Sequence, residues 1–587
     1  MKMHRPLAFV YAVVAVAVMH GATKPNPTRA QTPAGSIAGQ LVAATDPPQP
    51  VRRAQVMLNR VDGPGGAAEI TDDDGRFRFV NVPAGRYLLS AAKAGMVRVN
   101  YGETRPGRPG SAIALDNRET IDTLVVRMLP GAVITGTVLD PLGSPAPGVE
   151  VQVLRVARTS GSPQMHETAS GRTDDRGVYR VFGLAPGEYL VAAQPRFRYG
   201  SGAARETTAA DVERARRLLT NPRAPGGAPD PSRPLGLAVV FHPATTEPSN
   251  AATITLSPGQ ERAGVDIALQ LMPLSMVRGR LVWPGATKPS PVTIMMVPLT
   301  SSPLLTLHGL GHDEVEQGGE TFTIRHVAPG RYGIVAQTAS LQRPELAAGS
   351  VLTAAHEVEV AGSDIDGLTL VMQPGGTVSG RITIDEPGGK ASLDLSRVSL
   401  SLRPDTTRPL ALRPARGRAQ ADGRFEITGI TPGRYRLTVQ LPRDAPGGWH
   451  ARAAVVNGVN ALDDPIELRA DMAVTDAVVT LSTRATELSG VIQDAAGHPA
   501  PEHFVVVFST DRQRWFRDSR RIQAVRPGTD GRFSVRALPP GDYFVAALTD
   551  VEDGEWFDPA FLDRLVPASI QVSLHDGEKT VQDIRIK

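Results

Sequence analysis

An aromatic residue stands ten positions ahead of a tyrosine at five places along this 587-residue chain. The five pairs are Phe77 and Tyr87, Tyr179 and Tyr189, Phe322 and Tyr332, Phe425 and Tyr435, and Phe533 and Tyr543. Each pair lies in a window that alternates turn signals with short strand patterns. The pairs recur at intervals of roughly 100 residues or more, which is the length of a domain and too long for a short-period solenoid. The sequence therefore predicts a tandem array of one kind of domain.

Two glycine signals accompany the aromatic pairs. The opening strand pattern of each unit has a glycine in its middle, at Gly39, Gly136, Gly279, Gly380 and Gly490. Asp-Gly stands just before the aromatic strand at Asp74-Gly75, Asp422-Gly423 and Asp530-Gly531, with Asp175-Arg176-Gly177 as a longer variant. The third unit lacks this signal. Because Asp-Gly supplies the positive φ angles of a tight hairpin, the strand before it is expected to pair with the strand after it.

A Pro-Gly turn comes just before each repeat tyrosine. It stands at Pro186-Gly187, Pro329-Gly330, Pro432-Gly433 and Pro540-Gly541, with Pro83-Ala84-Gly85 in the first unit. Proline and then glycine at the two central positions predict a type II turn, in which the glycine has a positive φ. The chain is expected to reverse there and to bring the tyrosine inward beside its partner aromatic.

About seven short strands per unit, separated by frequent turns, predict an all-β chain of five tandem antiparallel β-sandwich domains, immunoglobulin-like or transthyretin-like. The content of 58 glycines and 50 prolines agrees with many tight turns. The predicted units 1 to 5 are residues 35–129, 131–272, 274–372, 375–482 and 485–587. The linkers between them are as short as Leu129-Pro130-Gly131, which predicts limited hinge motion.

Unit 2 differs from the others by an insert at residues 196–241. Residues 209–219 read as a short helix, with an aspartate near its start and arginines toward its end. A loop rich in proline and glycine follows. The insert either carries a contact site on the surface or is an inert variation in length.

The N-terminal 30 residues have the layout of a secretory signal: Lys2 and Arg5, an apolar run from Leu7 to Met19, then small and polar residues. The apolar run is shorter than the roughly 20 residues that a membrane helix needs, so no membrane span is expected after the signal is removed. Cysteine is absent, so packing alone must stabilise the units. These features predict export to the periplasm, the cell surface or the medium of a bacterium. A net charge of +3 gives no reason to expect nucleic acid as a partner.

The repeated unit, with its mid-strand glycine, Asp-Gly-x-Phe and Pro-Gly-x-Tyr, resembles the carboxypeptidase regulatory-like domain. That family is a transthyretin-like β-sandwich that falls among carbohydrate-binding-like folds. It accompanies some zinc carboxypeptidases, and it also recurs in tandem without any peptidase in exported bacterial proteins. The resemblance covers nearly the whole chain after the leader and is weakest in the third unit. It specifies the fold and not an activity, because the shared residues belong to turns and cores.

The sequence shows no arrangement that predicts catalysis, a cofactor or a metal. Its His-x-x-Glu, at His575 and Glu578, encloses Asp-Gly and reads as a turn, whereas metallocarboxypeptidases need a further histidine downstream. His308 and His312 are spaced like zinc ligands of a helix, but glycines between them disfavour a helix. Asp72-Asp73-Asp74 lacks the spaced ligands and closing glutamate of a calcium loop. The sequence therefore predicts a protein that is not an enzyme.

The best candidates for ligand binding are Arg514, Trp515 and Phe516 in an arginine-rich segment, and Trp556 in an acidic loop. Aromatic residues flanked by arginines can stack on sugar rings or hold acidic groups when they are exposed. The alternative is a segment that buries one aromatic in the core and leaves its arginines in water.

The leading functional hypothesis is an exported, non-catalytic binding or spacer protein of the bacterial cell envelope, whose partner is a polysaccharide or an envelope or extracellular protein. The alternative is an accessory or regulatory subunit of a secreted peptidase or glycan-processing system, as the family resemblance implies.

Overall fold

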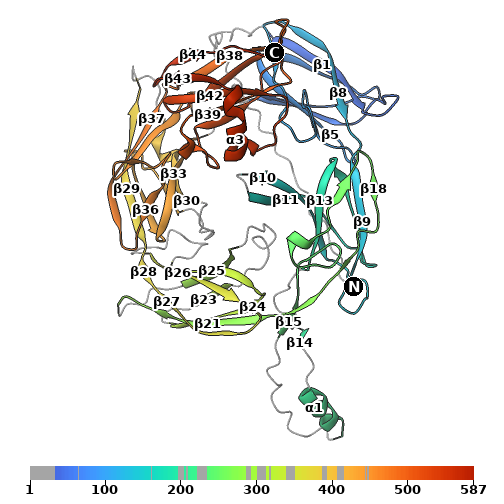
Figure 1. The fold of residues 1–587 in the computed structure, drawn as a ribbon, viewed down its shortest axis with the longest axis vertical. Helices are drawn as coiled ribbons and strands as arrows, with labels where there is room; N and C mark the ends of the chain where they lie inside the picture. Colours follow the sequence, from blue (N-terminus) through green and yellow to red (C-terminus); the bar gives the residue numbers. More distant parts are fainter. Residues whose placement is uncertain are drawn as a thin grey trace, which may run out of the picture.

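The structure is a computed structural model that describes residues 34–586 except 62, 64, 160–161, 196–203, 206–208, 221–233, 286–291, 300–311, 316–318, 339–350, 387–392, 406–414, 443–444 and 446–447. Strands dominate it (Figure 1). Buried hydrophobic side chains form one main cluster within each predicted unit, and units 2 and 5 each have a second cluster. In the described part of the chain, no helix is long and apolar enough to cross a membrane.

Unit 1 shows the plan that the other units repeat. Its strands are β1 (Ala34–Ala43), β2 (Gln55–Arg60), β3 (Gly66–Ile70), β4 (Arg76–Pro83), β5 (Gly85–Ala92), β6 (Val99–Asn100), β7 (Ile113–Leu115) and β8 (Thr120–Met128). One sheet has the order β4-β1-β8, and the other contains β3, β2 and β5 with β6 and β7 at its edge. The inward side chains of both sheets share one core, so the predicted β-sandwich is confirmed.

Units 2 and 3 follow the same order with additions. Unit 2 comprises β9 (Ala132–Leu139), β10 (Glu150–Thr159), β11 (Ser162–Arg172), β12 (Val178–Leu184), β13 (Gly187–Gln194), β14 (Ala204–Arg205), α1 (Ala209–Thr220), β15 (Pro234–Leu237), β16 (Val240–Phe241), η1 (Pro248–Asn250), β17 (Ile254–Leu256), β18 (Glu261–Arg262), β19 (Ile267–Ala268) and β20 (Leu271–Pro273). Unit 3 comprises β21 (Ser275–Val282), β22 (Val292–Pro298), β23 (His312–Val315), β24 (Thr321–Val327), β25 (Gly330–Gln337), β26 (Leu352–Val360), β27 (Ile365–Val371) and β28 (Gln373–Pro374).

Units 4 and 5 complete the chain. Unit 4 comprises β29 (Gly376–Asp385), η3 (Leu395–Arg397), β30 (Ser399–Pro404), β31 (Ala415–Arg418), β32 (Arg424–Ile430), β33 (Gly433–Gln440), β34 (His450–Val456), β35 (Val459–Asn460), β36 (Ile466–Leu468) and β37 (Ala473–Ser482). Unit 5 comprises β38 (Glu487–Gln493), β39 (Phe504–Ser509), η4 (Arg512–Arg514), β40 (Ile522–Val525), β41 (Arg532–Arg536), β42 (Gly541–Leu548), η5 (Glu555–Phe557), α3 (Pro559–Leu565), η6 (Val566–Ala568), β43 (Ile570–Leu574), β44 (Lys579–Val581) and β45 (Ile584–Arg585).

The opening strand of each unit pairs in parallel with a closing strand near the end of the unit, whereas the other strand pairs are antiparallel. β1 pairs with β8, β21 with β27 and β29 with β37 in this way, and the short closing strands of units 2 and 5 do the same. The closing strand slips in register opposite the mid-strand glycine of the opening strand. A Cβ on Gly39 would lie 2.4 Å from the carbonyl oxygen of Leu124, and one on Gly380 would lie 1.9 Å from that of Ala477. The repeated glycine is therefore required by close backbone contact.

The Asp-Gly segments connect strands of different sheets, so the predicted hairpin pairing is wrong, although a single antiparallel bridge between Ala419 and Phe425 flanks the segment in unit 4. In unit 1, β3 pairs with β2 in one sheet, whereas β4 pairs with β1 in the other. The turn itself has the expected tight form, because the amides of Asp74 and Arg76 donate to the Asp72 carboxylate and Gly75 has a φ of +73°. Gly75 packs against β1, where a Cβ would lie 2.5 Å from the Leu41 carbonyl oxygen. The turn thus carries the chain across the sandwich.

The Pro-Gly segments also connect the two sheets, and they are not type II turns. Four of these glycines have φ values between +146° and +158°, at Gly85, Gly187, Gly330 and Gly541. A type II turn needs a φ near +80° at its second central residue. The wide crossing between sheets extends the backbone at the glycine, and this conformation still favours glycine over residues with a side chain.

Each repeat tyrosine closes this crossing with its hydroxyl group. The hydroxyl donates to the carbonyl of the residue four positions earlier, at 2.6 Å for Tyr87, 2.7 Å for Tyr189, 3.0 Å for Tyr332, 2.8 Å for Tyr435 and 2.5 Å for Tyr543. The ring lies in the core, as predicted. Burial raises the pKa of Tyr332 and of Tyr543 to about 12. A hydroxyl that must donate inside the core explains why tyrosine, and not phenylalanine, occupies this position five times.

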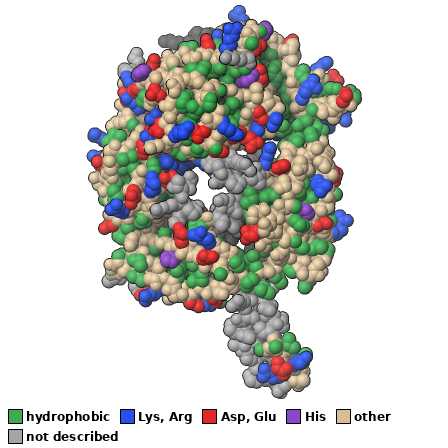
Figure 2. Space-filling model, viewed as in Figure 1, with side chains coloured by type: hydrophobic (Ala, Val, Ile, Leu, Met, Phe, Trp, Pro, Cys, Tyr) green, Lys and Arg blue, Asp and Glu red, His purple; other side chains and the backbone are tan. Residues whose placement is uncertain are grey.

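The five units follow one another around a closed ring (Figure 1), and the space-filling view shows an opening through its middle (Figure 2). Unit 1 meets unit 5, so the first and last units of the chain are neighbours in space. Inside the ring, β10 of unit 2 lies against η5 of unit 5.

The α-helices of the described residues lie at two places. α1 confirms the helix predicted in the insert, and it lies outside the ring (Figure 1). α3 was not predicted, since the expectation for this region was the acidic loop of Trp556, which precedes the helix. Its start is marked by Asp558, whose side chain accepts from the amide of Ala560, and by a proline at the first helical position. Its buried residues Phe561 and Leu562 join the second core of unit 5.

Candidate functional site

Trp515 lies in the core and not on the surface. Its side chain is only 5% exposed, its ring packs against Phe508 at 5.6 Å, and its indole N–H donates to the Ser509 carbonyl at 2.7 Å. Of the two interpretations that the sequence left open, the buried aromatic describes Trp515. Trp556 is half-buried and packs on the same cluster, beside Phe557.

Arg514 and Phe516 lie where unit 5 meets unit 4. The Arg514 side chain pairs with Asp464 of unit 4. The guanidinium of Arg436, also from unit 4, stacks over the Phe516 ring with 3.9 Å from its central carbon to the ring centroid. The candidate binding segment is therefore part of a joint between two units, which we call the 4–5 joint.

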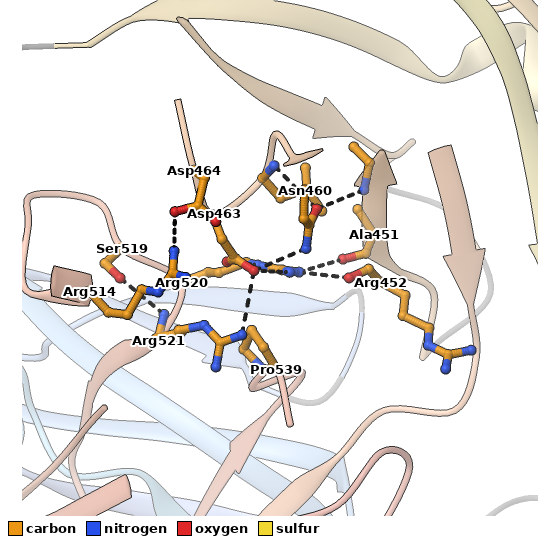
Figure 3. A network of polar contacts seen from close by, with 12 residues as sticks. Ala451, Arg452, Asn460, Asp463, Asp464, Arg514, Ser519, Arg520, Arg521 and Pro539 are labelled. Atoms are coloured by element: carbon orange, nitrogen blue, oxygen red, sulfur yellow. Dashed lines mark hydrogen bonds and ion pairs between the residues drawn. The ribbon is translucent and has the colours of Figure 1, made fainter. Parts of the chain in front are cut away.

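Asp463 is the centre of the 4–5 joint (Figure 3). Its side chain is 5% exposed, and Arg520 donates to both carboxylate oxygens, from Nε at 2.6 Å and from Nη2 at 2.8 Å. The remaining Nη1 of Arg520 donates to the carbonyls of Ala451 and Arg452 at 3.1 and 3.0 Å. Asn460 also donates to Asp463, at 3.0 Å. A two-pronged arginine–carboxylate contact of this kind fixes orientation as well as distance.

Further arginines surround the same carboxylate. Arg521 lies 3.5 Å from Asp463 and also donates to the Pro540 carbonyl of the Pro-Gly crossing in unit 5. Burial by itself would raise the pKa of Asp463. The hydrogen bonds from Arg520 and the positive charges of Arg520, Arg521 and Arg514 outweigh burial, so the pKa lies below its usual value. The carboxylate stays ionised in the joint at neutral pH.

A second ion-pair group lies on the same joint and is more exposed. Arg452 of unit 4 contacts Asp385 and, across the joint, Asp576 of unit 5, both at 2.6 Å. Arg484, in the linker, adds a contact to Asp576 at 3.3 Å. The aspartate of the predicted turn at 575–578 thus serves the joint, and His575 and Glu578 bond each other at 2.8 Å within that turn.

The joints between units 1 and 2 and between units 3 and 4 use glycine instead of charge. In the first, a Cβ on Gly131 would lie 2.5 Å from the Cα of Gly183; in the second, a Cβ on Gly375 would lie 2.7 Å from the Cα of Gly429. The linker glycine also donates its amide to the preceding unit in both joints, at 3.0 and 2.7 Å. Backbone therefore packs on backbone where these units meet.

The partners of the arginine-rich segment could not be found by sequence reasoning. Asp463 and Asp464 lie 57 and 50 positions from the arginines that bind them, in a different unit. The pair of aspartates before Pro465 was the only local signal, and it reads equally well as a turn.

Metal-site candidates gain no support from the described residues, in which no three potential ligand side chains gather around one point. Asp72 accepts amide hydrogen bonds of its own turn. His312 lies on β23, whereas His308 is outside the described residues.

The family model of the carboxypeptidase regulatory-like domain matches the chain twice, at residues 36–122 and 133–217. The resemblance expected from the motifs is confirmed for these two segments, which lie in units 1 and 2. No curated protein matches the chain.

Solved structures with some similarity include two bacterial pilins. GBS52, the minor pilin of Streptococcus agalactiae, is 12% identical over 41% of this chain and 97% of that chain, with a TM-score of 0.21. The shaft pilin SpaA of Lactobacillus rhamnosus GG is 11% identical over 29% of this chain and 90% of its own, with a TM-score of 0.17. The Bacillus anthracis TIE protein is 10% identical over 75% and 68%, with a TM-score of 0.14. Scores this low carry no argument about this chain.

Proposed function

We propose that this chain is an exported, non-catalytic scaffold of the bacterial cell envelope, in which five β-sandwich units are held in a fixed ring. Two of its units match a regulatory-like domain, and its repeated residues serve turns, cores and joints. The 4–5 joint carries the proposal, because the buried Asp463 is held by Arg520 and also sits among further arginines. Such a joint favours a rigid spacer over a flexible string of domains.

The buried Asp463–Arg520 ion pair stabilises the joint only while both partners are present. Removal of one member leaves the other charge buried and uncompensated, which typically costs about 3–5 kcal/mol. Asp463→Asn removes the charge but keeps the size of the side chain. We therefore expect D463N to loosen units 4 and 5 relative to each other while each unit keeps its own core.

Small-angle X-ray scattering of the chain in solution tests this proposal. The wild type is expected to scatter as a compact ring, and D463N to show a larger radius of gyration. Asp422→Asn is the matched control, because Asp422 lies in an exposed turn of unit 4 and bonds only its neighbourhood in the described structure. A wild-type profile typical of a flexible string would contradict the rigid scaffold.

The partner is proposed to be a polysaccharide or a protein of the envelope. Trp515 is a poor probe for sugar binding because its substitution would damage the core. A glycan array probed with the wild type and with Trp556→Ala, whose side chain is half-buried, tests the sugar alternative. Export is tested separately by cell fractionation and by mass spectrometry of the mature N-terminus, with cleavage expected after Ala22 or Ala30.

The alternative, an accessory subunit of a secreted peptidase or glycan-processing system, is favoured by the regulatory-like domain match alone. Co-purification of a peptidase with the tagged chain from the native host would support it. Binding of purified glycans by the chain on its own would favour the scaffold.

A further inference from the structure

Ion pairs connect unit 1 to unit 5 at the place where the ring closes. Arg108 of unit 1, whose side chain is only 10% exposed, lies 2.9 Å from Asp550 and 3.3 Å from Glu552 of unit 5. Arg105 reaches Asp550 at 3.2 Å. We call this contact between units 1 and 5 the latch.

Backbone groups align the two sides of the latch. Ala112 and Gly528 form a parallel bridge, and the amide of Thr529 donates to the Ala112 carbonyl at 2.9 Å. The Arg526 side chain of unit 5 donates to the Pro109 carbonyl of unit 1 at 2.9 Å. The latch therefore has a defined register as well as complementary charge.

Its two sides are polar and different from each other. No hydrophobic cluster of the described residues spans the latch, because the cores of units 1 and 5 are separate. The unit 1 side offers Arg105 and Arg108, and the unit 5 side offers Asp550 and Glu552. Opening of the contact would therefore break ion pairs and hydrogen bonds without dividing a shared hydrophobic core.

We propose that the latch also docks between copies, with unit 1 of one molecule bound to unit 5 of a second copy of this chain. The latch joins unlike surfaces, and a contact of that type forms a closed ring within one chain or links copies head to tail. It is also the one junction between neighbouring units of the ring that no linker crosses. Within one chain, the two sides of the latch meet at an effective concentration on the order of millimolar, which favours closure over linkage. Copies therefore link when the latch of the single chain cannot close.

Charge exchange between two variants tests the docking. In Arg108→Glu, the introduced glutamate faces Asp550; in Asp550→Arg, the introduced arginine faces both Arg105 and Arg108. Each variant alone is expected to be an open monomer. Mixed in equal amounts, the pair restores opposite charges at both ends of two chains, and light scattering is expected to give about twice the monomer mass.

The double variant R108E/D550R distinguishes docking between copies from closure within one chain. It restores opposite charges inside a single molecule and is expected to be a compact monomer. If it closes while the mixture of single variants stays monomeric, the proposal is wrong. The proposal also fails if R108E remains closed by small-angle scattering.

A control variant shows whether reversal of an arginine's charge in unit 1 by itself disturbs folding. Arg76→Glu changes an exposed arginine of unit 1 whose ion pair, within the described part of the chain, is with Asp74 of its own turn, and this variant should stay a closed monomer. Should R108E fail to fold, Arg105→Glu takes its place, because the Arg105 side chain is 71% exposed. R105E and D550R are then mixed, once both are shown to be folded and open. If this mixture stays monomeric, the proposal is likewise wrong.

Discussion

At the scale of single residues, the repeat tyrosine combines two contributions that substitution can separate. Tyr435→Phe removes only the hydroxyl, which donates to the Thr431 carbonyl at 2.8 Å. We expect a loss of about 1–2 kcal/mol in the free energy of unfolding of unit 4, since a buried carbonyl loses its partner. Tyr435→Ala also removes the buried ring and should cost about 3–5 kcal/mol. Chemical denaturation measures both, and equal losses in the two variants would contradict the role given to the hydroxyl.

Glu103, on the unit 1 side of the latch, gives the ring a dependence on pH. Burial raises its pKa to about 7, while bonds with Asn100 and the charge of Arg526 act in the opposite direction. Glu502 and Asp550 also face Arg526. Between its ordinary pKa of 4.5 and about 7, the folded state binds more protons than the unfolded state, so stability falls as pH rises through this window.

The Glu103→Gln variant is expected to remove this loss of stability with rising pH. The loss is at most about 3 kcal/mol, and solvent screening makes it smaller because Glu103 is partly exposed. Thermal unfolding between pH 4.5 and 8 measures it. Glu69→Gln, on the exposed strand β3, is the control and should keep the wild-type trend. A wild-type trend in E103Q would assign the effect to another group.

At the scale of elements, the glycine joints predict an asymmetric effect of alanine. Gly131→Ala would place a Cβ against the backbone of Gly183 and of Gly95, so the joint between units 1 and 2 must open. Gly183→Ala meets no atom closer than 4.0 Å and suffers only from its φ of +78°, a cost of about 1–2 kcal/mol. Limited proteolysis should cut near residue 130 in G131A and not in G183A. Equal cleavage of the two variants would contradict the backbone contact.

Elements within a unit were predictable from sequence because their signals are local. The alternating strands, the mid-strand glycine and the inward tyrosine all appear where they were expected. The pairing across Asp-Gly was not predictable, since the same tight turn serves a hairpin and a crossing between sheets. The role of Trp515 and its neighbouring arginines was hidden for a different reason, because Asp463 and Arg436 come from another unit and contact between units leaves no periodic pattern.

At the scale of the whole molecule, two carboxyl groups make stability depend on pH in opposite directions. The lowered pKa of Asp463 means that the 4–5 joint gains stability above the ordinary carboxyl pKa and loses it as pH falls through the lowered value. Glu103 destabilises the folded state as pH rises toward about 7, because its raised pKa comes first from burial. The free energy of unfolding should therefore be greatest in mildly acidic solution and fall on both sides. Chemical denaturation across this range should show no alkaline fall in E103Q, and a stability independent of pH would refute this account.

The parallel pairing of first and last strands has a mechanical consequence. Because β1 and β8 run side by side in the same direction, the chain enters a unit at one end and leaves it at the other. Tension applied through the neighbouring units would slide one strand along the other and strain their shared backbone hydrogen bonds together, instead of peeling them apart one at a time. An opened ring pulled from its two ends would thus be a row of tension-bearing links, each resisting extension until its whole strand pair gives way.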